Sequence, residues 1–313
     1  MLGVERMCHL AVVSRAGYYR HLTETVPGEA EVTLQASIQE IVLTHQRRYG
    51  YRRVTAELHR RGMAINHKRV LRMMRNDNLL AVRFRKFILT TDSRHECEVR
   101  LNLAARMTLT GINQLWVADI TYVRLQTEFV FLAVVIDRFS RKAIGWSLDR
   151  TLAARVAVAA LQQAISRRQP PPGLVHHSDQ GIQYACGDYV DILKAHHIVP
   201  SMSRPANPYD NAACESFMKT LKQEEIYCKD YRDFDDLSAH LEEFIGNYYN
   251  RLRLHSALGY RTPEEFERDA AATPATGGVA EAATVRYFTP PPRGPVQESA
   301  NRNLPELREG AAS

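Results

Sequence analysis

The sequence contains little that would suit a secreted or membrane-spanning protein. Its five cysteines include no Cys-x-x-Cys pair and no Cys/His spacing of a zinc site, and an odd number without a framework indicates reduced thiols. The longest uninterrupted apolar run covers only residues 129–136, far short of a membrane span. The N-terminus lacks the apolar core of a signal peptide. We therefore expect a soluble cytoplasmic protein with no membrane partner.

What the sequence does contain is a concentrated basic block. The 313 residues suffice for about two domains, and the net charge is +6. From Gln46 to Phe87 there are 13 Lys and Arg residues against only Glu57 and Asp77, a local excess of +11, so the remainder is net acidic (6 − 11 = −5). Such a block favours a surface that meets phosphates, and the alternative is a solvated basic face.

Three short helices are predicted around this block. Apolar residues repeat at three-to-four spacing from Leu34 to His45, a second stripe follows at Val54 and Leu58, and Asn66 suits the N-cap of a helix over 67–76. A basic last helix is typical of a helix-turn-helix, whose final helix enters the major groove of DNA. A small helical bundle with a soluble basic face is the alternative.

The next segment predicts a different architecture. Strands are expected at 115–125, 129–136, 143–148, 174–178 and 198–202, and helices at 153–168, 184–197 and 209–227. This order predicts an α+β ribonuclease-H-like core, a mixed five-stranded sheet flanked by helices, preceded by the small all-α helix-turn-helix domain. We divide the chain into an arm (1–33), a helix-turn-helix domain (34–80), a basic linker (81–112), the catalytic core (113–230), a helical extension (231–270) and a mostly disordered tail (271–313).

Three carboxylates carry the predicted chemistry. Asp119 lies mid-strand, Asp179 follows a strand and precedes a turn, and Glu215 lies on a helix. Carboxylate oxygens are ligands for hard divalent cations, and two such ions about 3.5–4 Å apart stabilise both the attacking and the leaving oxygen of a phosphoryl displacement. These residues therefore predict a polynucleotidyl transferase.

The helix of Glu215 offers further polar groups on the same face. Asn211 stands four positions earlier, Lys219 four later and Lys222 seven later. An amide and two ammonium groups beside a metal ligand can meet phosphate oxygens, so we expect these three residues to contact DNA.

Each acid also has a structural explanation. Asp119 could pair with a buried arginine, Asp179 could hold a turn, and Glu215 could form an exposed ion pair with Lys219. These explanations account poorly for three acids on the strand, strand end and helix of one fold. Asp137 is a rival ligand, but the arginines that follow it favour a structural ion pair or turn.

Seven motifs together indicate a known family. They are Tyr-Gly-Tyr-Arg-Arg-Val (49–54), Asn-His-Lys-Arg-Val-Leu-Arg-Met-Met (66–74), Trp-Val-Ala-Asp-Ile-Thr-Tyr (116–122), Val-Ile-Asp-Arg-Phe-Ser-Arg (135–141), His-Ser-Asp-Gln-Gly (177–181), Tyr-Asp-Asn-Ala (209–212) with Glu215, and Tyr-Tyr-Asn (248–250). The chain resembles the OrfB transposases of the IS-three (IS3) family of bacterial insertion sequences. More broadly, it is similar to the retroviral-integrase core of the DDE superfamily. The resemblance covers about residues 5–268.

The resemblance implies a function and a set of ligands. It implies that Asp119, Asp179 and Glu215 bind two Mg²⁺ ions, for which Mn²⁺ can substitute, and that Lys222 contacts DNA near the cleavage site. The implied activity is hydrolysis of phosphodiester bonds at insertion-sequence ends, followed by strand transfer from the freed 3′-hydroxyl. Within the basic segment the expected DNA contacts are Arg52, Arg53, Lys68, Arg69 and Arg72.

The resemblance also implies partners. These are insertion-sequence ends and target DNA, in a homo-oligomer associated with the bacterial nucleoid. In this family the active enzyme is typically a frameshifted fusion with an upstream helix-turn-helix and leucine zipper, which this sequence lacks, so we expect the upstream-frame protein as a further partner. Two alternatives stay open: a ribonuclease-H-type nuclease without strand transfer, and a non-catalytic DNA-binding regulator.

Overall fold

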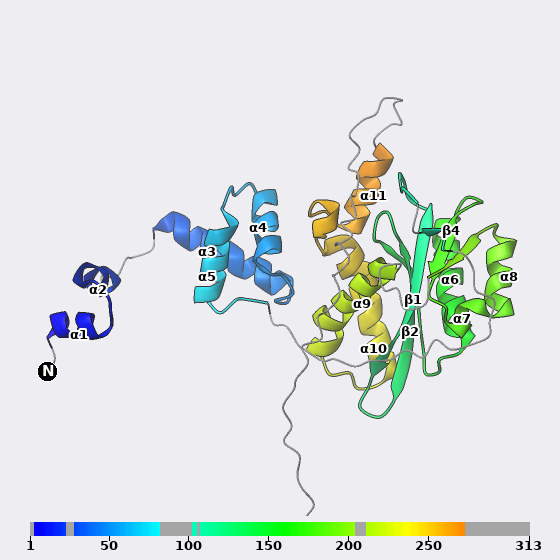
Figure 1. Cartoon of the computed structure of the whole chain (residues 1–313), viewed down its shortest axis with the longest axis horizontal. Helices are drawn as coiled ribbons and strands as arrows, with labels where there is room; N and C mark the ends of the chain where they lie inside the picture. Colours follow the sequence, from blue (N-terminus) through cyan, green and yellow to red (C-terminus); the bar gives the residue numbers. More distant parts are fainter. Residues whose placement is uncertain (1–2, 23–27, 82–101, 105–106, 204–210, 273–313) are drawn as a thin grey trace, which may run out of the picture. The chain divides into compact units, whose positions relative to one another are not determined.

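The structure is a computed structural model, and it describes residues 3–22, 28–81, 102–104, 107–203 and 211–272 (Figure 1). The greater part of the expected linker, the first residues of the helix expected from 209, and nearly all of the expected tail lie outside the described residues. None of the described helices is long and apolar enough to cross a membrane.

The N-terminal region is entirely helical where it is described. Helices α1 and α2 lie in the segment expected as an arm, and α3, α4 and α5 follow; their bounds are Val4–Leu10, Arg15–Leu22, Glu29–Thr44, Tyr51–Arg60 and His67–Asn76. The predicted cap of the last helix is present, because the Asn66 side chain accepts a hydrogen bond from the Lys68 amide at 2.8 Å. The predicted apolar stripe of α3 is buried as well.

The sheet has five strands in the order β3-β2-β1-β4-β5. β1 (Leu115–Arg124), β2 (Phe129–Asp137) and β3 (Ala143–Asp149) form an antiparallel meander. β4 (Val175–Ser178) pairs in parallel with β1, and β5 (Val199–Met202) pairs in parallel with β4. The predicted mixed five-stranded sheet is confirmed, and β1 is its central strand.

Each face of the sheet has its own apolar core. Side chains alternate along a strand, so Val117 packs in one core with α9 (Ala212–Glu224) and α10 (Phe234–Glu242), whereas Trp116 and Ala118 pack in the other with α6 (Ala154–Arg168) and α8 (Gly187–Ala195). Figure 1 shows α9 and α10 on one side of β1 and β2, and α6, α7 (Ile182–Ala185) and α8 on the other. Asp119 is two positions after Val117 on the same strand, so its side chain points to the same face of the sheet, the α9 side.

A glycine permits the close approach of α6 to the sheet. A Cβ atom added at Gly145 of β3 would lie 2.2 Å from the carbonyl oxygen of Ala160 and 2.9 Å from the amide of Ala164. Only a residue without a side chain allows these two backbones to pack so closely.

Two predicted helices are divided in the structure. The helix expected over 184–197 is two helices, α7 (Ile182–Ala185) and α8, because Cys186 between them is extended at φ −69° and ψ 151°. The helix expected over 209–227 is described from Ala212 and ends at Glu224, and a 3₁₀ turn, η3 (Ile226–Cys228), follows it. After α10 the chain continues as a π-helix, η4 (Glu243–Leu252). A 3₁₀ turn, η5 (Ser256–Leu258), and α11 (Pro263–Ala272) complete the described chain.

Candidate active site

Two of the three predicted acids lie on neighbouring strands. Asp119 stands in the middle of β1, opposite Val134 of β2, and Asp179 directly follows the last residue of β4. β4 runs parallel to β1 and pairs with its first residues, up to Val117 with His177. The chain therefore leaves β4 beside the part of β1 that carries Asp119.

The third acid is placed by a hydrogen bond at the start of α9. The side-chain amide of the buried Asn211, which precedes α9, donates to the carbonyl oxygen of Ala118 at 3.0 Å. This bond holds the helix start against β1 beside Asp119, and Glu215 follows one turn later on an exposed position. Apolar side chains of α9, including Phe217 and Leu221, pack onto the same face of the sheet.

The carboxylates influence one another electrostatically. Burial and the negative charges of Asp179 and Glu215 together raise the pKa of Asp119 to about 7, against a hydrogen bond from the Ile120 amide and the positive charge of Lys222. Two like charges close to a buried carboxyl favour its protonated form unless a cation is present. Desolvation also raises the pKa of Glu215. The structure thus brings the charges of three predicted site acids within range of each other.

The described residues fit a cation site that requires further ligands. No three His, Cys, Asp or Glu side chains among them are arranged closely enough to hold an ion by themselves. However, two buried polar atoms near the acids, the Tyr184 hydroxyl and the Asn211 Oδ1, have no hydrogen-bond partner in the described part of the chain. Ordered water or an ion usually satisfies such atoms, and carboxylates are the donors that Mg²⁺ prefers.

The two predicted lysines of α9 differ in their surroundings. Lys219 is exposed, whereas Lys222 is half-buried with its Nζ 5.3 Å from the ring centroid of Tyr122. Burial lowers the pKa of Lys222, and the charge of Asp119 raises it. Lys222 is therefore a cation held close to the acids, while Lys219 faces solvent.

Asp137, the rival acid, has a structural role. Its side chain is fully buried and accepts hydrogen bonds from the amides of Asn113 (2.7 Å), Phe139 (3.0 Å) and Ser140 (3.1 Å). Burial raises its pKa, and these backbone amides lower it. The expected turn is present, and backbone amides donate hydrogen bonds to the carboxylate.

Comparison with known proteins identifies the family. Residues 110–208 and 196–263 match models of an integrase core domain, and residues 29–87 match an HTH-like domain. The transposase InsF for insertion sequence IS3A of Escherichia coli (strain K12) is 36% identical over 269 residues, which cover 84% of this chain and 93% of that protein. The chain belongs to the IS3 family of transposases. The predicted membership is confirmed.

Other relatives agree with this assignment of the IS3-family transposase. An uncharacterized 31 kDa protein of insertion element IS600 from Shigella sonnei is 35% identical over 264 residues, covering 83% of this chain and 97% of that protein. The transposase for element IS904 of Lactococcus lactis subsp. lactis (strain IL1403) is 36% identical, covering 75% and 93%. The HTLV-2 integrase catalytic core in complex with magnesium overlaps at a TM-score of 0.38 and 19% identity, covering 50% of this chain and 97% of that one, a likeness too low to carry an argument.

The basic residues of the HTH-like region of this transposase fall into two groups. Arg52 on α4 and Lys68, Arg69 and Arg72 on α5 are exposed. Arg53 is half-buried, and its guanidinium donates to the carbonyl oxygen of Leu254 at 3.0 Å and to Glu224 at 3.2 Å. Four of the five expected DNA contacts thus face solvent, and the fifth contacts the C-terminal part of the same chain.

A buried ion-pair network, not anticipated from the sequence, anchors the end of α9. Glu224 also accepts hydrogen bonds from Nε and Nη2 of Arg253, each at 2.8 Å. Glu225 forms an ion pair with Arg48 at 2.5 Å. Burial raises the pKa of Glu224, but the hydrogen bonds and charge of Arg253 outweigh burial and lower the pKa overall. The helix of Glu215 is therefore tied to α4 of the HTH-like region through Arg53. The sequence shows these glutamates and arginines, but it does not show which of them pair.

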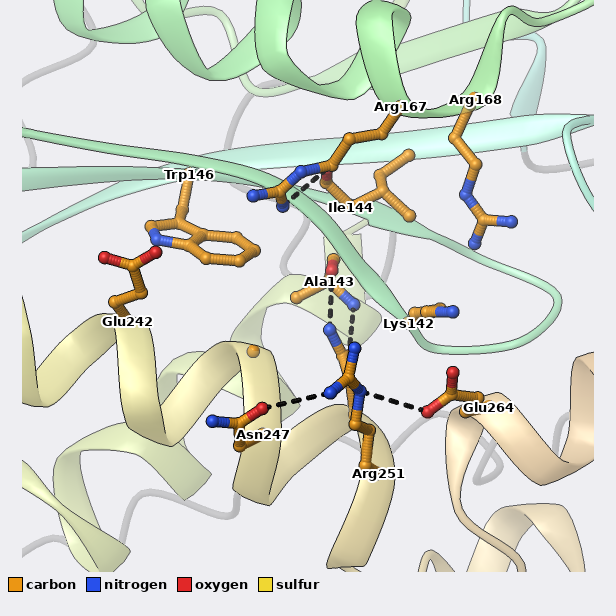
Figure 2. Close-up of a pocket in the computed structure, with 12 residues that line it drawn as sticks. Lys142, Ala143, Ile144, Trp146, Arg167, Arg168, Glu242, Asn247, Arg251 and Glu264 are labelled. Carbon is orange, nitrogen blue, oxygen red and sulfur yellow. Dashed lines mark hydrogen bonds and ion pairs between the residues drawn. The ribbon is translucent and has the colours of Figure 1, made fainter.

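A cavity of about 420 Å³ lies apart from the acids (Figure 2). Figure 2 shows Arg251 between Asn247 and Glu264, to which it donates at 3.2 Å and 3.3 Å, and the Arg167 guanidinium lies 4.2 Å from the Trp146 ring centroid. None of its lining residues is a predicted site residue. The acids remain the better candidate for chemistry.

Proposed function

We propose that this chain is a DNA transposase whose Asp119, Asp179 and Glu215 form one catalytic site. The site hydrolyses phosphodiester bonds at insertion-sequence ends and then transfers the freed 3′-hydroxyl to a second phosphodiester. The proposal rests on membership of the IS3 family together with the placement of the three acids.

One observation carries the proposal. Asp119 lies on β1, Asp179 directly follows β4, which pairs with β1, and the bond from Asn211 to Ala118 holds the helix of Glu215 against β1. The charges of Asp179 and Glu215 accordingly raise the pKa of Asp119. Residues so far apart in the sequence gain nothing in stability from gathering like charges beside the half-buried carboxyl of Asp119. Perturbed carboxyls of this kind are typical of functional sites, where a cation or substrate compensates the repulsion.

The three acids are the residues that would hold Mg²⁺ or Mn²⁺. When bound, a pair of such ions supplies charge stabilisation for the attacking and leaving oxygens. In the first step a water oxygen bonds to phosphorus, the bond between phosphorus and the 3′ oxygen breaks, and that oxygen takes up a proton. In the second step the oxygen of the freed 3′-hydroxyl bonds to the phosphorus of the second phosphodiester, the bond from that phosphorus to its own 3′ oxygen breaks, and the released oxygen takes up the proton. The nucleophile is a DNA hydroxyl, so no Ser, Tyr or Cys is needed to form a covalent intermediate.

The chain's own cations hold the DNA. Lys222 is the cation nearest to Asp119 on α9 and meets a phosphate oxygen beside the acids, and Lys219 contacts the backbone further out. The exposed Arg52, Lys68, Arg69 and Arg72 bind DNA at the HTH-like region. Contacts to phosphates make the affinity strongly dependent on salt.

The partners follow from this function. They are insertion-sequence ends and target DNA, further copies of this chain on that DNA, and the upstream-frame protein of the same element. A nucleoid-associated location in the bacterial cell accompanies DNA binding.

A cleavage and joining assay tests the proposal. The full chain, with the upstream-frame protein added in a parallel reaction, is incubated with a labelled insertion-sequence end and Mg²⁺. We expect nicked and strand-joined products, and their loss in Asp119→Asn, Asp179→Asn, Glu215→Gln and excess chelator.

The control is Asp191→Asn, which alters an exposed acid of α8 that pairs with Lys194. It should retain activity. Full activity of all three site variants, or full activity in chelator, contradicts the proposal. Nicking without joining identifies a nuclease, and DNA binding without either reaction identifies a regulator.

A further inference from the structure

Tyr184 and Tyr189 are two buried tyrosines with different hydrogen bonding. Their rings pack edge to face with centroids 5.4 Å apart, and both belong to the core on the α6 side of the sheet. The Tyr189 hydroxyl bonds to Nε2 of His176 at 2.9 Å. The Tyr184 hydroxyl is buried and bonds to nothing in the described part of the chain.

Tyr184 packs close to Asp179, one of the three proposed catalytic acids, because a Cβ atom added at Gly181 would lie 3.0 Å from the Asp179 Oδ1 and 3.5 Å from the Cδ2 atom of the Tyr184 ring. Tyr184 is on α7, which follows Asp179 after Gln180 and Gly181. Burial raises the pKa of the Tyr184 phenol well above its usual value, and the negative charges of Asp179 and Asp119 contribute to the rise. A tyrosine hydroxyl of ordinary pKa, about 10, is already protonated near neutral pH, so it carries a hydrogen-bond donor.

A buried donor without a partner is costly. Leaving one unsatisfied costs about 1–3 kcal/mol, and native proteins usually satisfy such groups with protein, water or a ligand. Since the phenol keeps its proton, its missing partner must be an acceptor. A carboxylate oxygen turned to coordinate a cation, or a water on that cation, is such an acceptor, and partners of this kind orient metal ligands.

We propose that Tyr184 is a positioning residue of the divalent-cation site: its O–H donates to an oxygen of the cation-loaded site, either the Asp179 carboxylate or a cation-bound water. This inference rests on the proposed function. Tyr184 takes no part in the reaction itself and acts by holding the acid in place. Tyr189, whose hydroxyl is already satisfied by His176, has no such role.

Thermal unfolding of the full chain, with and without Mn²⁺, tests this inference without measuring activity. In Tyr184→Phe the ring remains and only the unsatisfied hydroxyl is lost. Without Mn²⁺ its Tm should equal or exceed that of the wild type. Its apparent Kd for Mn²⁺, from the Tm against Mn²⁺ concentration, should rise about tenfold, as for loss of other outer partners of metal ligands.

Tyr189→Phe is the matched control. It removes a satisfied hydroxyl from the adjacent ring and leaves His176 without its partner, so it should lower the Tm without Mn²⁺ and keep the wild-type Kd for Mn²⁺. Asp179→Asn should lose the response to Mn²⁺ altogether.

The outcomes separate this inference from the proposed function. If Tyr184→Phe binds Mn²⁺ as tightly as the wild type while Asp179→Asn does not, the cation site stands and the role of Tyr184 is overturned. A lower Tm of Tyr184→Phe without Mn²⁺ also overturns it, because the hydroxyl would then have a partner in the cation-free fold. If the wild type shows no response to Mn²⁺, the cation site and the role of Tyr184 fall together.

Discussion

The amide of Asn211 donates a hydrogen bond to the carbonyl oxygen of Ala118, at 3.0 Å. The acceptor belongs to the residue before Asp119, and the donor immediately precedes the helix that carries Glu215. A single bond thus holds the start of the helix that carries Glu215 against the strand that carries Asp119. The sequence suggested Asn211 as a DNA contact, but the side chain is buried and its amide is already engaged within the protein.

Replacing Asn211 with alanine should affect both stability and activity. The Ala118 carbonyl loses its side-chain donor in a buried setting, which costs about 1–3 kcal/mol in the free energy of unfolding. Strand cleavage should fall by about tenfold or more, because small displacements of catalytic groups are costly. Urea unfolding and the cleavage assay measure the two effects. Asn247→Ala, on an exposed position of η4, is the control and should change stability by no more than about 0.5 kcal/mol. Wild-type cleavage by Asn211→Ala would show that this bond does not position α9.

Replacement by glutamine should affect a different property at each of the neighbouring arginines: protein stability at Arg53 and DNA affinity at Arg52. Arg53→Gln removes bonds to Glu224 and to the Leu254 carbonyl, and should lower the free energy of unfolding by about 1–3 kcal/mol. Arg52→Gln should leave stability within about 0.5 kcal/mol, since the side chain is exposed. It should instead weaken DNA binding and lower the slope of log K against log salt by about 1.

Urea unfolding and salt-dependent DNA titrations of both variants measure this contrast. Unchanged stability of Arg53→Gln, or unchanged DNA affinity of Arg52→Gln, would contradict the respective assignment. The pair is a sensitive comparison because the two substitutions are chemically identical and adjacent in the sequence.

Stability should decline in acid partly because of His45. Burial and the positive charges of Arg48, Arg61 and Arg53 together lower the pKa of His45 to about 4, against the negative charge of Glu224. The folded-state pKa lies below the unfolded value of 6.5, so this contribution to stability is complete above pH 6.5 and is lost as the pH falls toward 4. Over 2.5 pKa units (6.5 − 4) the loss is about 3 kcal/mol.

His45→Phe should reduce this acid sensitivity. The ring can still stack on Tyr49, whose centroid lies 3.7 Å from that of His45, and the buried Nδ1, unpartnered in the described part of the chain, is removed. Urea unfolding at several pH values between 4 and 7 compares the two proteins. An acid decline of the same size in His45→Phe would assign the proton uptake to other groups, such as His176, whose pKa burial lowers to about 3.

Much of the fold follows from local patterns. The five strands, the helix over 67–76 and its Asn66 cap were predictable because side-chain periodicity and capping depend on residues a few positions apart. The division of the helix expected over 184–197 was missed, because the extended Cys186 interrupts an otherwise continuous apolar pattern. The Asp119 strand position and the Glu215 helix were likewise predictable, but their mutual approach depends on strand order.

The sequence by itself determined the family, the elements and the acidic residue types suited to divalent cations. Only the tertiary structure decided what each polar side chain contacts: Arg53 faces Glu224 while Arg52 faces solvent, and the hydroxyl of Tyr189 is satisfied while that of Tyr184 is not. The physical reason is distance along the chain. Arg48 and Glu225 are 177 positions apart. No local sequence period encodes which distant group becomes the hydrogen-bond partner of a buried side chain, because burial and pairing arise only when the cores assemble.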